Sequence, residues 1–123
     1  MLGLDGLPAI ASLDFSSHPT LMMLSIPNTN ITTRCNPKAP NLLQLDLENV
    51  GKFYSLDVAN MTKLSTLKIK NCHWIENLYC DNSPLKVIEV SGQYVQYFTC
   101  SNVKLDTPID LSSLPRLRAF GLT

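Results

Sequence analysis

The chain has 123 residues, enough for one domain, and its ten basic and ten acidic side chains cancel. Lysine and arginine form no cluster, so the concentrated positive field that attracts nucleic acid or an acidic membrane surface is missing. No apolar run approaches the roughly 18 residues of a membrane span, so we expect no insertion into a bilayer.

A short hydrophobic unit recurs along the whole chain. A full copy reads apolar-x-x-apolar-x-apolar-x-Asn, and most copies start about eleven residues after the previous one. Short repeats kept in phase predict a solenoid, because such a unit can bury its apolar face only against its neighbours. We take the second apolar residue of each copy as its reference position. In chain order these positions are Leu2, Leu13, Leu24, Cys35, Leu45, Leu56, Leu67, Leu78, Ile88, Phe98, Ile109 and Phe120.

Alternate reference positions define two rows. In each segment the apolar residues have period two, as in Leu45 and Leu47, which fits half-buried strands. We therefore predict a mainly β solenoid of about five to six coils, with short parallel strands along each side and little helix. Row A holds Leu24, Leu45, Leu67 and Ile88, spaced 21, 22 and 21 residues apart, and row B holds Leu13, Cys35, Leu56, Leu78 and Phe98.

Two stretches depart from the repeat. Apolar residues are sparse around Cys35, which predicts a loop within an irregular stretch near residues 30–40. Near residues 101–108 the phase is ambiguous. Strict alternation assigns Ile109 to row A, whereas an inserted half-repeat or a bulge would make it a row B position. The chain also starts and stops inside the repeat. We therefore expect one solenoid over residues 1–123 that is a fragment of a longer protein, and uncapped ends that can associate end to end.

Asparagine stands at the exit of six of these twelve segments. Its side chain can hydrogen-bond local backbone, and the residue tolerates left-handed dihedral angles, so we expect a turn at each of these positions. In stacked coils such side chains can also bond one another. This turn ladder comprises Asn28, Asn49, Asn60, Asn71, Asn82 and Asn102.

The units Leu42 to Asn49 and Leu64 to Asn71 resemble leucine-rich repeats, and this resemblance covers nearly the whole chain. The run Leu56-Asp57-Val58 through Leu67, and Cys100-Ser101-Asn102, resemble the short repeats of Bacteroidetes cell-surface proteins, which would imply secretion or a cell-surface location. The runner-up is the repeat region of plant F-box proteins, which Leu67 to Cys72 also resembles and which would imply an intracellular location. The superfamily implies partner binding through an exposed sheet face and no catalysis.

Outward positions of the repeat supply the candidate contact residues. In row A the residue after each reference position reads Ser25, Asp46, Lys68 and Glu89, which makes either a recognition strip or a solvated face with self-satisfied ion pairs. Exposed aromatic side chains often dominate binding. We assign this role to Tyr54, Tyr79, Tyr97 and Trp74, although Trp74 can instead fold over the edge of the core.

Cysteines suit either a buried core or a metal site. Cys80 and Cys100 share an inward position one coil apart, and we expect them to act as small apolar core residues with free thiols. Cys72, His73 and Cys80 have no recognised zinc spacing. We predict no metal site and no cofactor.

The sequence thus favours a non-enzymatic module that binds a macromolecule, with protein the first choice and glycan possible. One alternative is a parallel β-helix enzyme acting on polysaccharide. Its acid and base would come from carboxylates such as Asp46 and Glu89, which we instead expect on an open surface beside lysines. A second alternative is a structural spacer between other domains.

Overall fold

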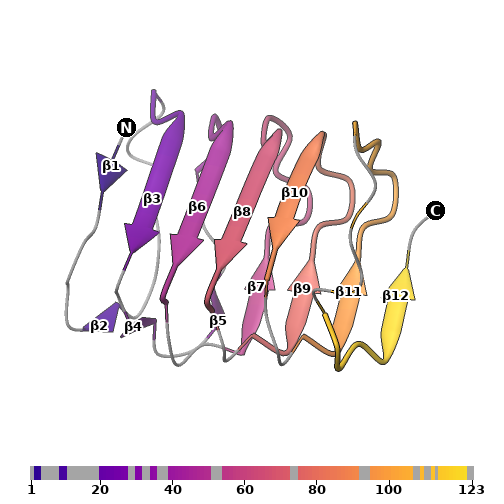
Figure 1. The fold of residues 1–123 in the computed structure, drawn as a ribbon. Coiled ribbons are helices and arrows are strands. Elements are labelled where there is room, and N and C mark those ends of the chain that lie inside the picture. Colours follow the sequence, from indigo (N-terminus) through magenta and orange to yellow (C-terminus); the bar gives the residue numbers. More distant parts are fainter. Residues whose placement is uncertain are drawn as a thin grey trace.

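Parallel strands stack into two sheets in the computed structural model of the chain (Figure 1). The structure describes residues 2–3, 9–10, 20–27, 30–31, 34–35, 39–50, 54–72, 75–91, 95–106, 109, 112 and 114–121. Among these residues helix is almost absent, and none forms a helix with the length and apolarity that a membrane crossing requires. The chain is a parallel β-solenoid.

The two sheets lie on opposite sides of the solenoid, and their strands point in opposite directions (Figure 1). A third, two-stranded sheet pairs β2 (Ala9–Ile10) with β4 (Asn30–Ile31). Sheet A has the order β1 (Leu2–Gly3), β3 (Met23–Pro27), β6 (Gln44–Glu48), β8 (Thr66–Lys70) and β10 (Val87–Val90). Sheet B has the order β12 (Ala119–Gly121), β11 (Tyr97–Thr99), β9 (Asn77–Tyr79), β7 (Ser55–Asp57) and β5 (Arg34–Cys35).

The predicted rows are confirmed as columns of directly paired residues. Three successive coils consist of the strand pairs β6–β7, β8–β9 and β10–β11. The predicted total of five to six coils stays a prediction, because part of it depends on residues outside the described ones. Leu13 also lies outside the described residues. In sheet A, Leu2 pairs Leu24, Leu24 pairs Leu45, Leu45 pairs Leu67, and Leu67 pairs Ile88. In sheet B, Cys35 pairs Leu56, Leu56 pairs Leu78, Leu78 pairs Phe98, and Phe98 pairs Phe120.

Strand pairing bears on part of each predicted irregular stretch. Arg34 and Cys35 form β5 and pair with β7, so the loop predicted at Cys35 is wrong there. Backbone pairing with a well-formed neighbouring strand outweighs a weak local apolar pattern. Phe120 pairs with Phe98, 22 residues earlier, which is one ordinary coil. Ile109 therefore lies in the row A half of its coil, as strict alternation assigns it, and the inserted half-repeat is wrong.

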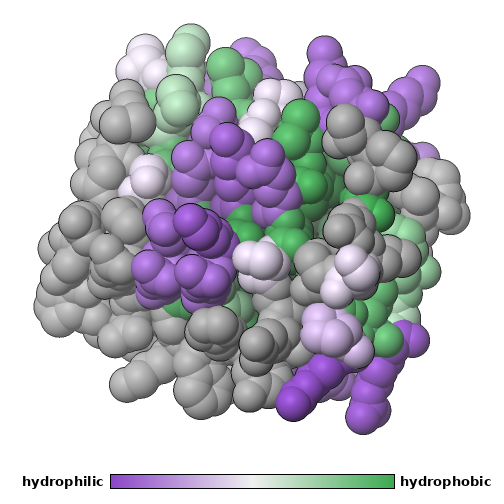
Figure 2. Space-filling view, in the orientation of Figure 1, coloured by the Kyte–Doolittle hydropathy of each residue, from purple (hydrophilic) through white to green (hydrophobic). Residues whose placement is uncertain are grey.

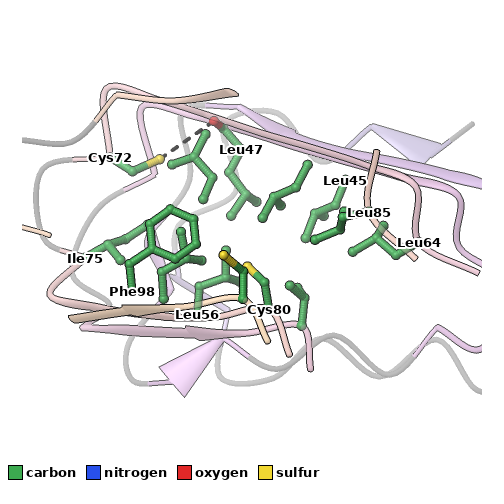
Figure 3. Packing of buried hydrophobic residues seen from close by; sticks show 14 of the residues in the cluster. Leu45, Leu47, Leu56, Leu64, Cys72, Ile75, Cys80, Leu85 and Phe98 are labelled. Carbon is green, nitrogen blue, oxygen red and sulfur yellow. Dashed lines mark hydrogen bonds between the residues drawn. The ribbon is translucent and has the colours of Figure 1, made fainter. Parts of the chain in front are cut away.

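The core fills the space between the two sheets. Inward residues from sheet A, such as Leu45 and Leu47, meet Leu56 and Phe98 from sheet B (Figure 3). These side chains are essentially inaccessible to solvent. Burying one side chain of this size contributes about 1.5–3 kcal/mol, so the core is the main source of stability. Phe98 also packs edge to face on Phe120, with ring centroids 5.4 Å apart and planes at 90°.

Asparagines turn the chain at the strand exits, as predicted. Every described member of the ladder has a positive φ: Asn49 54°, Asn60 60°, Asn71 53°, Asn82 59° and Asn102 60°. Asn28 lies outside the described residues. On the sheet B side the amides also bond from coil to coil. The Nδ2 of Asn82 donates to Oδ1 of Asn60 at 3.2 Å, and the Nδ2 of Asn102 donates to Oδ1 of Asn82 at 2.7 Å.

A buried hydroxyl joins two coils in a way the repeat pattern does not reveal. Ser83 is 1% exposed, and its Oγ accepts the backbone N–H of Met61 at 3.2 Å and donates to the carbonyl of Val58 at 2.5 Å. A serine can therefore sit in the core at little cost, because both backbone groups and the hydroxyl are satisfied.

Candidate binding surfaces

The outer face of sheet A carries a regular array of side chains. Successive side chains of a strand point to opposite faces, so residues beside each reference position project outward. Parallel pairing then aligns them in columns across the sheet. One column reads Met23, Gln44, Thr66 and Val87, the next reads Ser25, Asp46, Lys68 and Glu89, and the last includes Glu48 and Lys70.

Charges of opposite sign alternate along these columns. Lys68 pairs in register with Asp46 on one side and Glu89 on the other, but within the described part of the chain no ion pair of 4.0 Å or less joins these three residues. Lys70 Nζ lies 3.6 Å from Glu48 Oε1, and both side chains are largely exposed. An exposed pair contributes at most about 1 kcal/mol. These charges therefore contribute little to stability, although the parallel register holds them at fixed positions on the face.

Asp46 is held in one orientation by its own strand. Gln44 Nε2 donates to Oδ1 of Asp46 at 2.9 Å and to Oδ2 at 3.1 Å. Figure 2 shows hydrophilic residues gathered over the middle of the face in view, where the sheet A strands lie in Figure 1. A carboxylate fixed in this way loses little side-chain entropy when a partner binds it.

An exposed apolar corner borders this strip and was missed by the sequence reasoning. This corner consists of Met22, which is 56% exposed, Met23, which is 37% exposed, and Leu43, which is 39% exposed. The backbone N–H of Leu43 donates to the carbonyl of Met22 at 2.8 Å, so the two residues are stacked. The signal was present in the sequence, since Met22 and Leu43 occupy equivalent positions just before their strands, but the repeat template gave that position no role.

The three candidate tyrosines differ in exposure and in their place on sheet B. Tyr54 precedes β7 and is 55% exposed, whereas Tyr97 on β11 is 43% exposed and Tyr79 on β9 is half-buried. Of these three, only Tyr79 and Tyr97 line a common hollow, whose volume is about 510 Å³. Trp74 and His73 lie outside the described residues. The other residues that line the hollow are Asn77, Phe98, Thr99, Ala119, Phe120 and Gly121.

Three cysteines are buried core residues. Cys72, Cys80 and Cys100 carry free thiols, which confirms the predicted placement of Cys80 and Cys100. Burial raises the pKa of Cys100 to about 11 and raises that of Cys80 well above its ordinary value. The Sγ of Cys72 donates weakly to the carbonyl of Leu47 at 3.7 Å (Figure 3). Protonated, inaccessible thiols are poor nucleophiles and poor metal ligands.

Titratable side chains suited to metal binding do not converge in the part of the chain that the structure describes, where no group of three His, Cys, Asp or Glu residues could hold an ion. Comparison with protein-family models, with curated proteins and with solved structures finds no match to this chain. Its own surfaces are therefore the basis for a functional argument.

Proposed function

We propose that the chain is a non-enzymatic leucine-rich-repeat module that binds a protein partner through the outer face of sheet A. The Leu-x-x-Leu-x-Leu-x-Asn units support the family assignment. The observation that carries the functional proposal is the column of Asp46, Lys68 and Glu89, which the parallel register holds side by side on three neighbouring strands.

The neighbouring apolar corner strengthens this proposal. Met23 begins β3, directly beside Gln44 and close to the charged column. Protein interfaces combine a few apolar anchors with a polar rim, and the charges of the rim set specificity and association rate. Met22, Met23 and Leu43 would supply the anchors, and methionine adapts readily to irregular partner surfaces. A rigid sheet also needs little ordering on binding.

The same face gives little support to the alternative of a polysaccharide-cleaving enzyme. Glu89 is exposed and Asp46 is bound by Gln44, so neither carboxyl lies in the buried setting that a general acid uses. Lys68 stands between Asp46 and Glu89 in the column, so these two carboxylates lie on strands that are not adjacent.

The test is a charge reversal of the column. A pull-down with the whole chain from host and bacterial extracts, followed by mass spectrometry, identifies the partner, and calorimetry with the purified partner gives its Kd. The triple variant Asp46→Lys, Lys68→Glu, Glu89→Lys should weaken binding at least roughly tenfold, because like charges then face each other across the interface. Glu76→Lys is the control, since Glu76 is exposed on the sheet B side and its reversal changes the net charge equally.

An unchanged Kd in the folded triple variant would contradict the proposed face. If neither this variant nor a Tyr54→Ala, Tyr79→Ala, Tyr97→Ala variant loses any binding, the chain is better described as a spacer. Cleavage of an acidic polysaccharide that is lost in Asp46→Ala or Glu89→Ala would instead establish the enzyme.

A further inference from the structure

The hollow on the outer face of sheet B has a regular construction. Three strands contribute two rows of outward residues. One row consists of Asn77, Tyr97 and Ala119, and the other consists of Tyr79, Thr99 and Gly121. The two tyrosines thus stand at diagonally opposite positions, and with strands about 4.8 Å apart and a rise of about 3.3 Å per residue their Cβ atoms are about 8 Å apart. This leaves room for one flat ring against each tyrosine.

Small residues make the surface concave at this point. Ala119 and Gly121 on β12 project less far from the sheet than the tyrosine side chains do. The strand β12 therefore forms a low shelf beside Tyr97. Beneath the shelf, Phe120 packs edge to face on the buried ring of Phe98. The floor of the hollow therefore rests on packed aromatic side chains.

The polar atoms at the hollow are also fixed in their roles. Thr99 Oγ1 donates to Oδ2 of Asp81 at 2.8 Å, and Asp81 Oδ1 accepts the backbone N–H of Ser101 at 2.6 Å. Because the hydrogen of the Thr99 hydroxyl goes to Asp81, that hydroxyl offers a ligand its lone pairs. The amide of Asn77 and the hydroxyls of Tyr79 and Tyr97 add groups that both donate and accept.

The described residues that line the hollow include no Asp, Glu, Lys or Arg, so none of them selects a charged ligand. We propose that the hollow binds a neutral sugar ring of a glycan. The C–H groups on one face of such a ring suit the negative face of a tyrosine, while its edge hydroxyls suit Asn77, Thr99 and the tyrosine hydroxyls. The hollow is open to solvent and has a volume of about 510 Å³, so one face of a sugar ring can lie against it.

A peptide anchor fits these features less well. An apolar side chain would fill the hollow and leave the Asn77 amide and the Thr99 lone pairs without partners, which costs affinity. A charged side chain would meet no opposite charge among the described lining residues. A sugar ring satisfies both the aromatic and the hydroxyl-rich parts at once.

The test uses the whole chain and soluble neutral polysaccharides. In native gels that contain mixed-linkage β-glucan, galactomannan or amylopectin, at least one should retard the protein, and calorimetry with the matching hexasaccharide then gives a Kd. Raising NaCl from about 0.05 M to about 0.5 M should change that Kd less than about twofold, because the ligand carries no charge.

Two variants block the hollow in different ways. Tyr97→Ala removes a half-exposed ring and should weaken binding roughly tenfold or more. Gly121→Leu fills the shelf and should weaken binding to a similar extent. A Cβ at Gly121 would meet Thr99 Cγ2 at 3.7 Å and Thr99 Cβ at 3.9 Å, which is ordinary contact, so the fold should tolerate the side chain. Tyr54→Ala is the matched control, because Tyr54 is more exposed than Tyr97 yet does not line the hollow.

Three results would overturn the proposal: retardation by no neutral polysaccharide, retardation only by polygalacturonate, or an equal loss in Tyr54→Ala and Tyr97→Ala. If Tyr97→Ala weakens only the protein partner, the hollow belongs to a protein interface and the sugar proposal also fails. Charge reversal of Asp46, Lys68 and Glu89 should leave glycan binding unchanged. The two proposals therefore fail independently.

Discussion

The asparagine ladder should contribute measurably to stability, and Asn82 is the position to test. Its φ is 59°, its Nδ2 donates to Asn60 at 3.2 Å, and its Oδ1 accepts from Asn102 at 2.7 Å. Asn82→Ala removes both side-chain hydrogen bonds, which at an exposed site are worth about 0.5 kcal/mol each. It also places a Cβ residue without a compensating polar group in the left-handed region, which costs about 1–2 kcal/mol. We expect a total loss of about 2–3 kcal/mol from these two contributions.

Asn82→Gly separates the two contributions. Glycine adopts a positive φ freely, so this variant loses only the two hydrogen bonds and gains some conformational entropy in the unfolded state. We expect the free energy of unfolding to fall by about 1.5 kcal/mol. Equilibrium urea unfolding followed by circular dichroism gives the free energies, and coincident tryptophan fluorescence would justify two-state fitting. Equal destabilisation by alanine and glycine would refute the dihedral argument. A loss below about 0.5 kcal/mol in both variants would refute the whole account.

Three further predictions concern the core, the thiols and the surface. Phe98→Ala should destabilise the chain by about 3–5 kcal/mol in the same urea assay, because it leaves a cavity between the sheets; a loss below about 1 kcal/mol would contradict that packing. The folded pKa of Cys100, about 11, lies above the ordinary value of 9.0, so the unfolded thiol ionises first. The free energy of unfolding should therefore be at its maximum below about pH 9 and fall as the pH rises towards about 11. The fall should be smaller in the double variant Cys80→Ala, Cys100→Ala. A urea midpoint that does not change over this pH range would contradict the burial of the thiol. Lys70→Ala should lower the free energy of unfolding by less than about 1 kcal/mol, because its ion pair with Glu48 is exposed. For the same reason, the urea midpoint of the wild-type chain should hardly change with salt concentration.

Local pattern was enough to predict most of the fold. The repeat fixes which residues face inward, because a one-residue shift of a strand would move its apolar set to the solvent. Leu45, Leu67 and Ile88 therefore pair as their spacing predicts, and Asn49, Asn60 and Asn71 adopt the turn geometry expected of asparagine.

Features that depend on neighbouring strands were not predictable in this way. Cys35 lies in a strand despite its weak local pattern, because β7 offers a partner for its backbone. The phase around Ile109 became clear only from the pairing of Phe120 with Phe98. Ser83 is buried with its hydroxyl bonded to the adjacent coil, which its own polarity gave no reason to expect.

By itself the sequence determined that this protein is a stack of short parallel strands, which residues fill its core, and where its chain turns, since each of these follows from a periodic local code. The tertiary structure alone decided which outward residues lie together. It separated Tyr54 from Tyr79 and Tyr97, set the small residues Ala119 and Gly121 beside Tyr97, and exposed Met22 and Leu43 at one corner. The reason is physical. Periodicity states whether a side chain points inward or outward, but the shape of a surface depends on the sizes of side chains on neighbouring strands about twenty residues away in sequence.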